Sequence, residues 1–346
     1  MNTKSFIILI VILVVGAGAY FYSGAKQSIN ASDNIGAPIL EGMQESLNNV
    51  TQMQVVGAGN KVLATIIRAN DSWAVKQRNS YPADLSKVRA ALLNLAEAKI
   101  VEEKTSNPDL YTKLGVEDVS AAEAIGVQAI VEYDDQSVGL IVGKPGPQMN
   151  KSRYVRLADS KTSWLIDRKI DLKYQAEHWL RKDILSVEPN EVSNITVTMQ
   201  NDGEVLAIAS SEEQEGEFIV TNLPNESAQV VGAELHQVAN ALSSFQLLDV
   251  ANAGEFKDLS PVINVDYQLK SGAKISLVGY DKEDAHFASV EASLVDGVED
   301  KTSAQAYVDK INNITSGWVY KIPNVTYDSM NKRVSDVLAI TEDQLN

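Results

Sequence analysis

The longest apolar run of the chain lies near its beginning and contrasts with the mixed pattern that follows. Residues 6–22 carry no charged side chain, and Lys4 and Lys26 flank them. At about 1.5 Å per helical residue this run spans roughly 25 Å, and the next three residues complete the ~30 Å of a bilayer core. We expect a membrane-anchoring helix whose apolar and interfacial residues include Phe6, Ile10, Leu13, Tyr20 and Tyr22.

A cleaved signal peptide is the alternative interpretation of this run. Ala17-Gly18-Ala19 has the small-x-small form of a cleavage site. The uncleaved anchor is favoured because the run exceeds the 7 to 15 apolar residues of a usual signal peptide. Under either interpretation we expect the rest of the chain to lie outside the cytoplasm.

Beyond a polar linker the pattern first predicts strands. The linker, residues 26–47, ends in a short amphipathic turn. Alternating segments at 50–56, 61–68 and 72–76 then predict a β-meander, with a hairpin turn at 57–60 and Trp73 as a core aromatic residue.

A helical period follows the meander. Leu85, Val88, Leu92 and Leu95 recur at spacings of three and four, which predicts an amphipathic helix. The next signals predict, in order, a short helix from Asn107-Pro108 to Gly115, a hairpin over 125–142, strands at 154–157 and 164–166, and a helix containing Trp179. Strands and helices in separate runs indicate an α+β domain.

The pattern of residues 48–188 then starts again. Residues 191–197 repeat the strand pattern of 48–55, Phe218 stands where Trp73 stood, and a helix predicted over 235–248 matches the one around Leu92. We predict an N-terminal transmembrane helix followed by two tandem, internally duplicated α+β domains, with antiparallel meanders and packed helices. The predicted parts are an anchor at 1–25, the linker at 26–47, and repeats at 48–188 and 189–342. The alternative is that two ordinary α+β domains share this order by coincidence.

Composition limits the functions expected of the chain beyond the apolar run, which we call the body. Forty-six acidic residues against 30 basic ones leave a net charge of −16, which argues against a nucleic-acid partner. The chain has no cysteine, and its three histidines, His178, His236 and His286, are far apart in sequence, so no metal site is expected. Ser-x-x-Lys occurs at 23–26 and 271–274 without the partner motifs of a serine acyl-enzyme. We therefore expect no cofactor and no catalytic residues.

Four strings occur in the first repeat and not in the second. They are Tyr81-Pro82-Ala83-Asp84, Tyr111-x-x-Leu-Gly-Val-Glu-Asp118, Arg153-Tyr154-Val-Arg156 and His178-Trp179-Leu180. In this order and at these spacings the chain resembles the DUF4340 family of bacterial single-span membrane proteins. That family has no established activity, and its members are often encoded beside subunits of ABC-2-type exporters similar to those of gliding-motility systems. The resemblance implies an auxiliary role at the bacterial inner membrane, with the body outside the cytoplasm and transporter subunits as partners.

Two functions are compatible with these observations. The first is a non-catalytic, membrane-anchored interaction module. The second is an envelope enzyme or ligand-binding protein that acts on cell-surface glycan or peptide, with Asp84 and Glu102 as acid and base.

The residues peculiar to the first repeat form a candidate interaction surface. If they are exposed, Tyr81→Ala and Arg156→Ala are expected to change the melting temperature by less than about 2 °C. The alternative is that they pack against the linker or between the two domains. The candidate residues are Tyr81, Pro82, Asp84, Tyr111, Arg153, Tyr154, Arg156 and Trp179.

Overall fold

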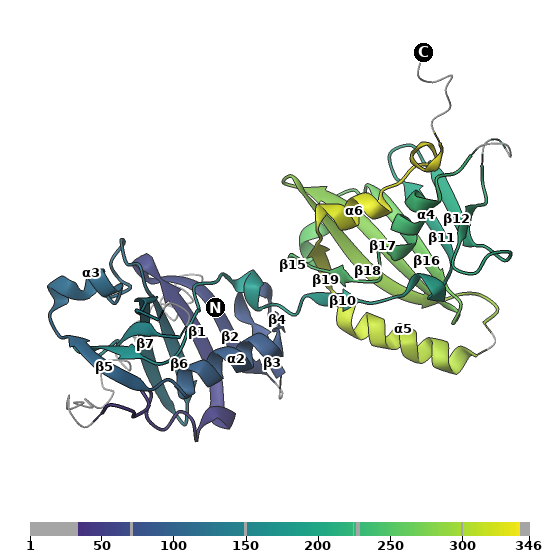
Figure 1. Cartoon of the computed structure of the whole chain (residues 1–346). Coiled ribbons are helices and arrows are strands. Elements are labelled where there is room, and N and C mark those ends of the chain that lie inside the picture. The colour runs from purple at the N-terminus through teal and green to yellow at the C-terminus, as the bar shows by residue number, and fades with distance from the viewer. Residues whose placement is uncertain are drawn as a thin grey trace, which may run out of the picture. The chain divides into compact units, whose positions relative to one another are not determined.

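The computed structural model describes residues 34–69, 72–148, 151–223, 225, 229–298 and 300–339. The chain forms two compact units, Met1–Leu180 and Arg181–Asn346 (Figure 1). The predicted anchor at residues 6–22 lies outside the described residues. Among the residues that are described, no helix is both long and apolar enough to cross a membrane.

The first unit is built on one nine-stranded antiparallel sheet. From β1 the chain forms a meander toward one edge, crosses through a helix to the opposite edge at β5, and fills the gap with a second meander from β6 to β9. In spatial order the strands are β4 (Tyr81–Pro82), β3 (Ser72–Val75), β2 (Lys61–Ala69), β1 (Val50–Gly57), β6 (Val127–Tyr133), β7 (Gln136–Pro145), β8 (Arg153–Leu157), β9 (Ser163–Ile166) and β5 (Ile100–Thr105).

Helix α2 (Leu85–Ala96) is the main helix of this unit. The Asp84 side chain caps it by accepting from the backbone N–H groups of Ser86 and Lys87, and its apolar stripe is buried. The remaining helical pieces are short: η1 (Leu47–Asn49), η2 (Ala58–Asn60), η3 (Lys76–Arg78), η4 (Pro108–Leu110), α3 (Tyr111–Leu114) and η5 (Ala176–Trp179).

The second unit contains an eight-stranded antiparallel sheet and a separate pair of short strands. The sheet runs in the order β13 (Phe218–Val220), β12 (Val205–Ser210), β11 (Val192–Met199), β16 (Ile263–Leu269), β17 (Ala273–Lys282), β18 (Ala285–Leu294), β19 (Trp318–Lys321) and β15 (Asp249–Asn252). The pair consists of β10 (Asp183–Leu185) and β14 (Phe245–Gln246).

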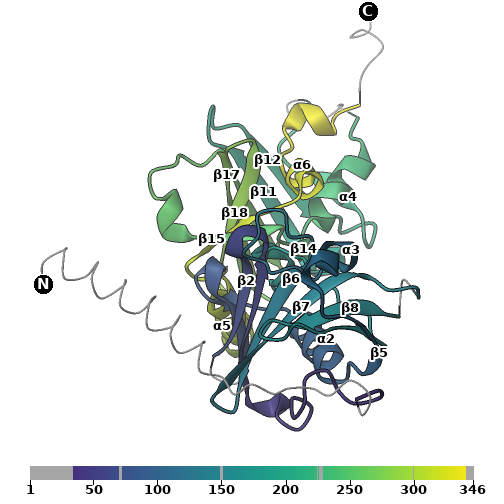
Figure 2. The same cartoon turned by 90° about the vertical axis from the view of Figure 1, so that its left-hand side faces the viewer.

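Helices α4 (Gly232–Asn240) and α6 (Asn324–Met330) lie side by side over one face of this sheet (Figures 1 and 2). On that face Tyr267 is fully buried and its hydroxyl donates to Val238 O of α4 at 2.9 Å. Helix α5 (Lys301–Thr315) packs against β18, where the Asn312 amide bonds both the N–H and the C=O of Ala292. The short helices are η6 (Pro189–Glu191), η7 (Ala253–Phe256) and η8 (Val334–Val337).

Apart from the extra edge strand β4 of the first sheet, the two sheets share their strand order, but some of their strands differ in how they are covered. Strands β16 and β17 alternate between buried and half-exposed residues, as expected for a sheet with one covered face. In the first unit residues 63–66 of β2 and all four residues of β9 are buried in succession. Those strands therefore have neighbours on both faces.

Most of the elements predicted in the first unit are confirmed, with the helix over 85–95 and the hairpin over 125–142 as the clearest cases. Several details of the two units were wrong or missed, among them β4, α5 and α6, which were not predicted. Trp73 is half-buried and not a core residue, and the edge strand β5 was not predicted. The helix predicted over 235–248 ends at Asn240, because Phe245 and Gln246 pair with β10.

Candidate functional site

Seven of the eight candidate residues of the first unit fall into two clusters, each of which attaches a segment to the sheet. The β4 cluster comprises Tyr81, Pro82, Asp84, His178 and Trp179. The Arg156 cluster comprises Tyr111, Val116, Asp118, Tyr154 and Arg156.

In the β4 cluster, the segment 178–180 runs beside the edge strand β4. Asp84 N–H donates to Trp179 O at 2.7 Å, and Lys87 Nζ donates to His178 O at 2.9 Å. An antiparallel bridge joins Ala83 to Leu180. The strand edge is thereby closed by the chain itself, which removes it as a site for pairing with another strand.

Arg156 occupies the centre of the second cluster, with its side chain only 4% exposed. Its Nε donates to Val116 O at 2.9 Å and its Nη1 to Ser160 O at 2.8 Å. Its Nη2 donates to Asp118 Oδ1 at 2.7 Å. A buried guanidinium must satisfy its fixed fork of donors, and here two backbone carbonyls and one carboxylate do so.

Tyr111 completes this arrangement from α3. The Arg156 guanidinium lies 4.7 Å from the centroid of its ring, and its hydroxyl donates to Lys161 O. Burial raises the pKa of Tyr111 above its ordinary value, opposed by the charge of Arg156 and assisted by that of Asp118. The phenol therefore stays protonated at neutral pH and keeps its role as a donor.

These contacts hold residues 106–126, which we call the cover segment, on one face of the sheet. Val116 is fully buried, and it packs with Tyr111 and Ile141 in one apolar cluster. A Cβ at Gly143 of β7 would come within 2.4 Å of Leu114 O, so only glycine allows this approach. The backbone of the cover segment also meets the β1–β2 turn, where Asn60 N–H donates to Val119 O at 3.0 Å.

The predicted exposure of the candidate surface was wrong for five of its members. Tyr81, Tyr111, Arg153, Arg156 and Trp179 are all buried, each at most 9% exposed. Pro82, Asp84 and Tyr154 are half-exposed. Arg153 belongs to neither cluster: its Nε donates to Ile170 O at 2.8 Å. The stated expectation that Tyr81→Ala and Arg156→Ala leave the melting temperature unchanged therefore loses its premise.

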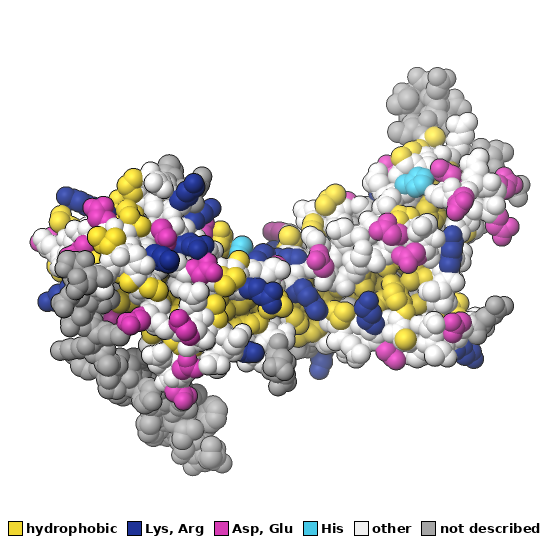
Figure 3. Space-filling model, turned by 60° about the horizontal axis from the view of Figure 1, so that its bottom comes forward, with side chains coloured by type: hydrophobic (Ala, Val, Ile, Leu, Met, Phe, Trp, Pro, Cys, Tyr) yellow, Lys and Arg dark blue, Asp and Glu magenta, His cyan; other side chains and the backbone are white. Residues whose placement is uncertain are grey.

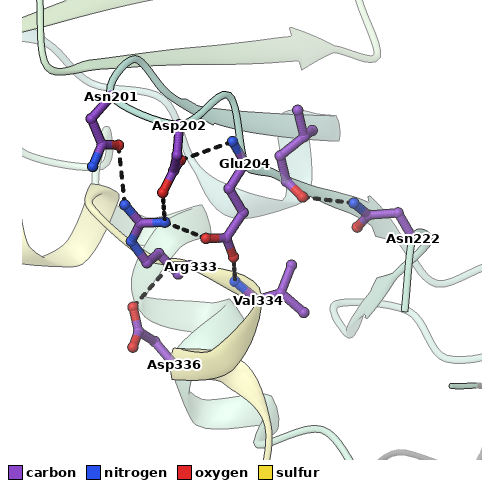
Figure 4. Close-up of polar contacts among 8 residues, drawn as sticks. Asn201, Asp202, Glu204, Asn222, Arg333, Val334 and Asp336 are labelled. Carbon is purple, nitrogen blue, oxygen red and sulfur yellow. Dashed lines mark hydrogen bonds and ion pairs between the residues drawn. The ribbon is translucent and has the colours of Figure 1, made fainter. Parts of the chain in front are cut away.

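A third polar cluster, in the second unit, was not predicted from the sequence. Arg333 Nη1 lies 2.8 Å from Asp202 Oδ2 and also contacts Glu204 Oε2, and Nη2 donates to Asn201 Oδ1 at 3.1 Å (Figure 4). Arg333 N–H donates to Asp336 Oδ2 at 2.8 Å. This Arg333 cluster attaches the segment after α6 to the β11–β12 turn. Arg333 and Asp202 lie about 130 residues apart in sequence, so no local sequence motif predicts their contact.

The residues considered for catalysis have structural partners. Asp84 caps α2, and Glu102 pairs with Lys104 at 2.6 Å. His236 pairs with Glu217 at 3.1 Å, and His286 pairs with Asp281 at 2.7 Å while its ring stacks on Tyr327. Over the residues that the structure describes, no three His, Cys, Asp or Glu side chains come together as metal ligands would.

A groove of 320 Å³ lies between α4 and α6. Its described lining contains Ala, Val, Ser, Thr, Asn, Gln and one histidine, His236. Elsewhere the surface is strongly charged, and Figure 3 shows acidic and basic side chains interspersed on one face of each unit. The absence of Asp, Glu, Lys and Arg from the described lining distinguishes this groove from that surface.

The fold and these clusters define a two-unit α+β protein with antiparallel sheets, whose polar clusters attach chain segments to the sheets. The model of a family described as a domain of unknown function, DUF4340, matches residues 73–271, which is more than half of the chain. The chain belongs to this family. No curated protein and no solved structure matches it.

Proposed function

We propose that this chain is a non-catalytic interaction module, anchored in the bacterial inner membrane by residues 6–22 with its body outside the cytoplasm, and auxiliary to an ABC-type exporter. The apolar run supplies the argument for the anchor, and the family resemblance supplies the argument for the exporter.

The non-catalytic role is supported by the hydrogen bonds of the motif residues, which are made to backbone groups of the same unit. Arg156, Tyr111 and Asp84 are the polar side chains a catalytic site would draw on, and each bonds a backbone group of its own unit. Groups committed to internal hydrogen bonds are poor acids, bases or nucleophiles, because they lack a free position toward a substrate. They are well suited to holding a rigid surface for a partner.

We further propose that the two units are copies of one ancestral unit. Each sheet has a central pair of strands, β1–β6 in the first unit and β11–β16 in the second. One meander extends from each side of this pair. Trp73 of β3 lies opposite Arg68 of β2, and Phe218 of β13 lies opposite Ser210 of β12. When the two sheets are aligned strand by strand, Trp73 and Phe218 take the same position. A coincidence of fold class alone would not require the same residue-by-residue register.

Irregular features repeat as well and support common ancestry more strongly than strand order does. Each central pair has a bulge near the start of β1 or β11. At that bulge Thr51 Oγ1 donates to Glu132 O at 3.3 Å, and Ser193 Oγ donates to Gln268 O at 3.0 Å. Bulges are specific local features, so two in the same place with the same type of side-chain bond favour duplication over chance.

The β2–β3 and β12–β13 strand pairs carry another matching feature. Gln77 Oε1 accepts from Thr65 N–H at 2.9 Å, and Asn222 Oδ1 accepts from Ala207 N–H at 2.9 Å. Both amides lie two residues beyond the last residue of their strand, β3 or β13. In each unit a side-chain amide thus bonds the neighbouring strand where β3 or β13 has already ended.

Topology is tested with a C-terminal alkaline phosphatase fusion, which is active only outside the cytoplasm. We expect activity from the full chain. Activity of a cytoplasmic reporter at the same position, with an inactive phosphatase, would reverse the proposed orientation.

The partner is tested by co-purification from membranes in mild detergent with a tag at Asn346. We expect ABC-transporter subunits in the eluate, identified by mass spectrometry. The control replaces residues 1–25 with an unrelated single-span anchor, which should retain the partner if the body binds it. Loss of the transporter subunits from both proteins would refute the proposal, and loss from the control alone would move the contact to the anchor.

A further inference from the structure

The groove between α4 and α6 has the chemistry of a small-molecule site. At 320 Å³ it lies at the lower end of the range for ligand pockets, large enough for one or two sugar-sized rings and too small for a long peptide. Ala233 and Val325 contribute apolar surface, and Val325 is 72% exposed. The groove therefore offers apolar contacts beside hydrogen-bonding groups.

The polar groups of the groove retain hydrogen-bonding capacity. Gln237 Nε2 donates to Glu234 Oε1 at 3.2 Å, and Asn240 Nδ2 donates to His236 O at 2.8 Å. Each amide has two N–H groups and a carbonyl oxygen with two lone pairs, so one bond apiece leaves donors and acceptors for a ligand. The internal bonds also orient the amides before a ligand arrives, which lowers the entropy lost on binding.

The charge of the groove selects the class of ligand. An anion would meet no Lys or Arg on the described lining, and the net charge of −16 opposes its approach. The described lining holds no carboxylate either; the two that bond its residues are Glu217, beside His236, and Glu234, which bonds Gln237 and pairs with Lys332. Hydroxyl groups suit this site, because each can both donate to and accept from Asn, Gln, Ser and Thr side chains.

We propose that the groove between α4 and α6 binds a small, uncharged, hydroxyl-rich molecule of the sugar class. Gln237 and Asn240 hydrogen-bond its hydroxyls, and Ala233 and Val325 contact its C–H faces. The site goes beyond the proposed role beside a transporter and does not depend on that role.

The test is saturation-transfer NMR on the full chain in a detergent without a sugar headgroup. N-acetylglucosamine and cellobiose serve as neutral probes, and glucosamine and glucuronate as matched cationic and anionic ones. We expect saturable binding of at least one neutral probe with Kd on the order of 1 to 10 mM, because the groove is open and its described lining contains no Phe, Tyr or Trp. The charged probes should bind at least about fivefold more weakly, since the described lining offers no side chain of opposite charge to either.

Variants locate the binding on α4. Gln237→Ala and Asn240→Ala should each weaken binding of the neutral probe about fivefold, as loss of one hydrogen bond does. Gln305→Ala removes a similar exposed glutamine from α5, away from the groove, and should leave the Kd unchanged.

Three results would overturn the assignment. They are no saturable signal from either neutral probe up to about 100 mM, equal binding of glucosamine or glucuronate, and equal effects of Gln237→Ala and Gln305→Ala.

Discussion

Arg156 and Arg333 both attach a chain segment to a sheet, but in different surroundings. The Arg156 side chain is 4% exposed and bonds mainly to backbone carbonyls, whereas that of Arg333 is 31% exposed and faces carboxylates. A buried guanidinium makes hydrogen bonds in a low-dielectric environment, where losing them is costly. An exposed one exchanges protein partners for water and salt ions at little cost. The same residue type is therefore a fixed structural element in the first unit and a condition-dependent one in the second.

This contrast follows the covering of the two sheets. The cover segment of the first unit spans residues 106–126, between β5 and β6. The corresponding connection in the second unit, between β15 and β16, is only residues 253–262. A longer connection can cross the sheet face and bury polar groups, which must then be satisfied internally. Of the buried polar or charged residues described, Thr315 alone belongs to the second unit.

The largest effect is expected from Arg156→Ala. This change leaves the buried Val116 O and the half-buried Ser160 O without their donor and frees the cover segment, and it should cost about 3 to 5 kcal/mol of unfolding free energy. Denaturant unfolding followed by tryptophan fluorescence measures it, because Trp73, Trp164 and Trp179 report on the first unit. Arg156→Lys keeps the charge without the planar fork of donors. Its unfolding free energy should lie between those of wild type and Arg156→Ala. A near-neutral Arg156→Ala would show that the cover segment does not depend on this arginine.

Gly143→Ala tests the close approach of the cover segment to β7. The added methyl would lie 2.4 Å from Leu114 O, and moving the backbone apart should cost about 1 to 3 kcal/mol. The same unfolding experiment measures the change. The control is Gly232→Ala at the start of α4, where a Cβ meets nothing within 4 Å and stability should hold or rise slightly. Equal effects of the two variants would contradict the packing described here.

Arg333→Met should have a smaller effect, and one that depends on salt. At 1 M NaCl the screening length falls to about 3 Å, so the difference between wild type and variant should shrink. The effect of Arg156→Ala should persist at the same salt concentration. Unfolding of the second unit is followed by Trp318, its one tryptophan. Two effects with the same salt dependence would remove the distinction between the clusters.

The smallest effect is expected from acid. The Glu204 N–H and the Arg333 side chain lower the pKa of Asp202 from its ordinary value of 3.8. A lowered pKa in the folded state adds stability that is present above pH 3.8 and is lost as the pH falls through the lowered pKa. Below pH 4 the Trp318 transition of wild type should therefore approach that of Asp202→Asn, which has no carboxyl group to titrate. A constant difference between the two down to pH 2 would contradict this role of Asp202.

Much of the first unit could be predicted because its signals are local. Asp84 before Leu85, and Asn107-Pro108 with Gly115, are helix boundaries written within a few residues of one another, and the structure has both. β5 was missed because Val101-Glu-Glu-Lys104 has the composition of an exposed loop. It forms a strand only because β9 lies beside it.

The candidate site could be predicted in its membership but not in its role. Tyr111 and Arg156 were selected because the predicted second repeat lacks them, and the structure brings them together. Their types suggested an exposed interface, since arginine and tyrosine are common in interfaces. The same types also satisfy buried carbonyls, and sequence does not distinguish the two uses.

By itself the sequence determined the features that depend on neighbouring residues: the apolar run at its start, the periods of most strands and of the helix over 85–95, and the family. The tertiary structure alone decided which polar residues are buried, that Arg156 holds the cover segment, and that Arg333 meets Asp202 and Glu204 across the second unit. Secondary-structure periodicity is set by local backbone geometry, whereas burial and charge pairing depend on contacts between residues remote in sequence.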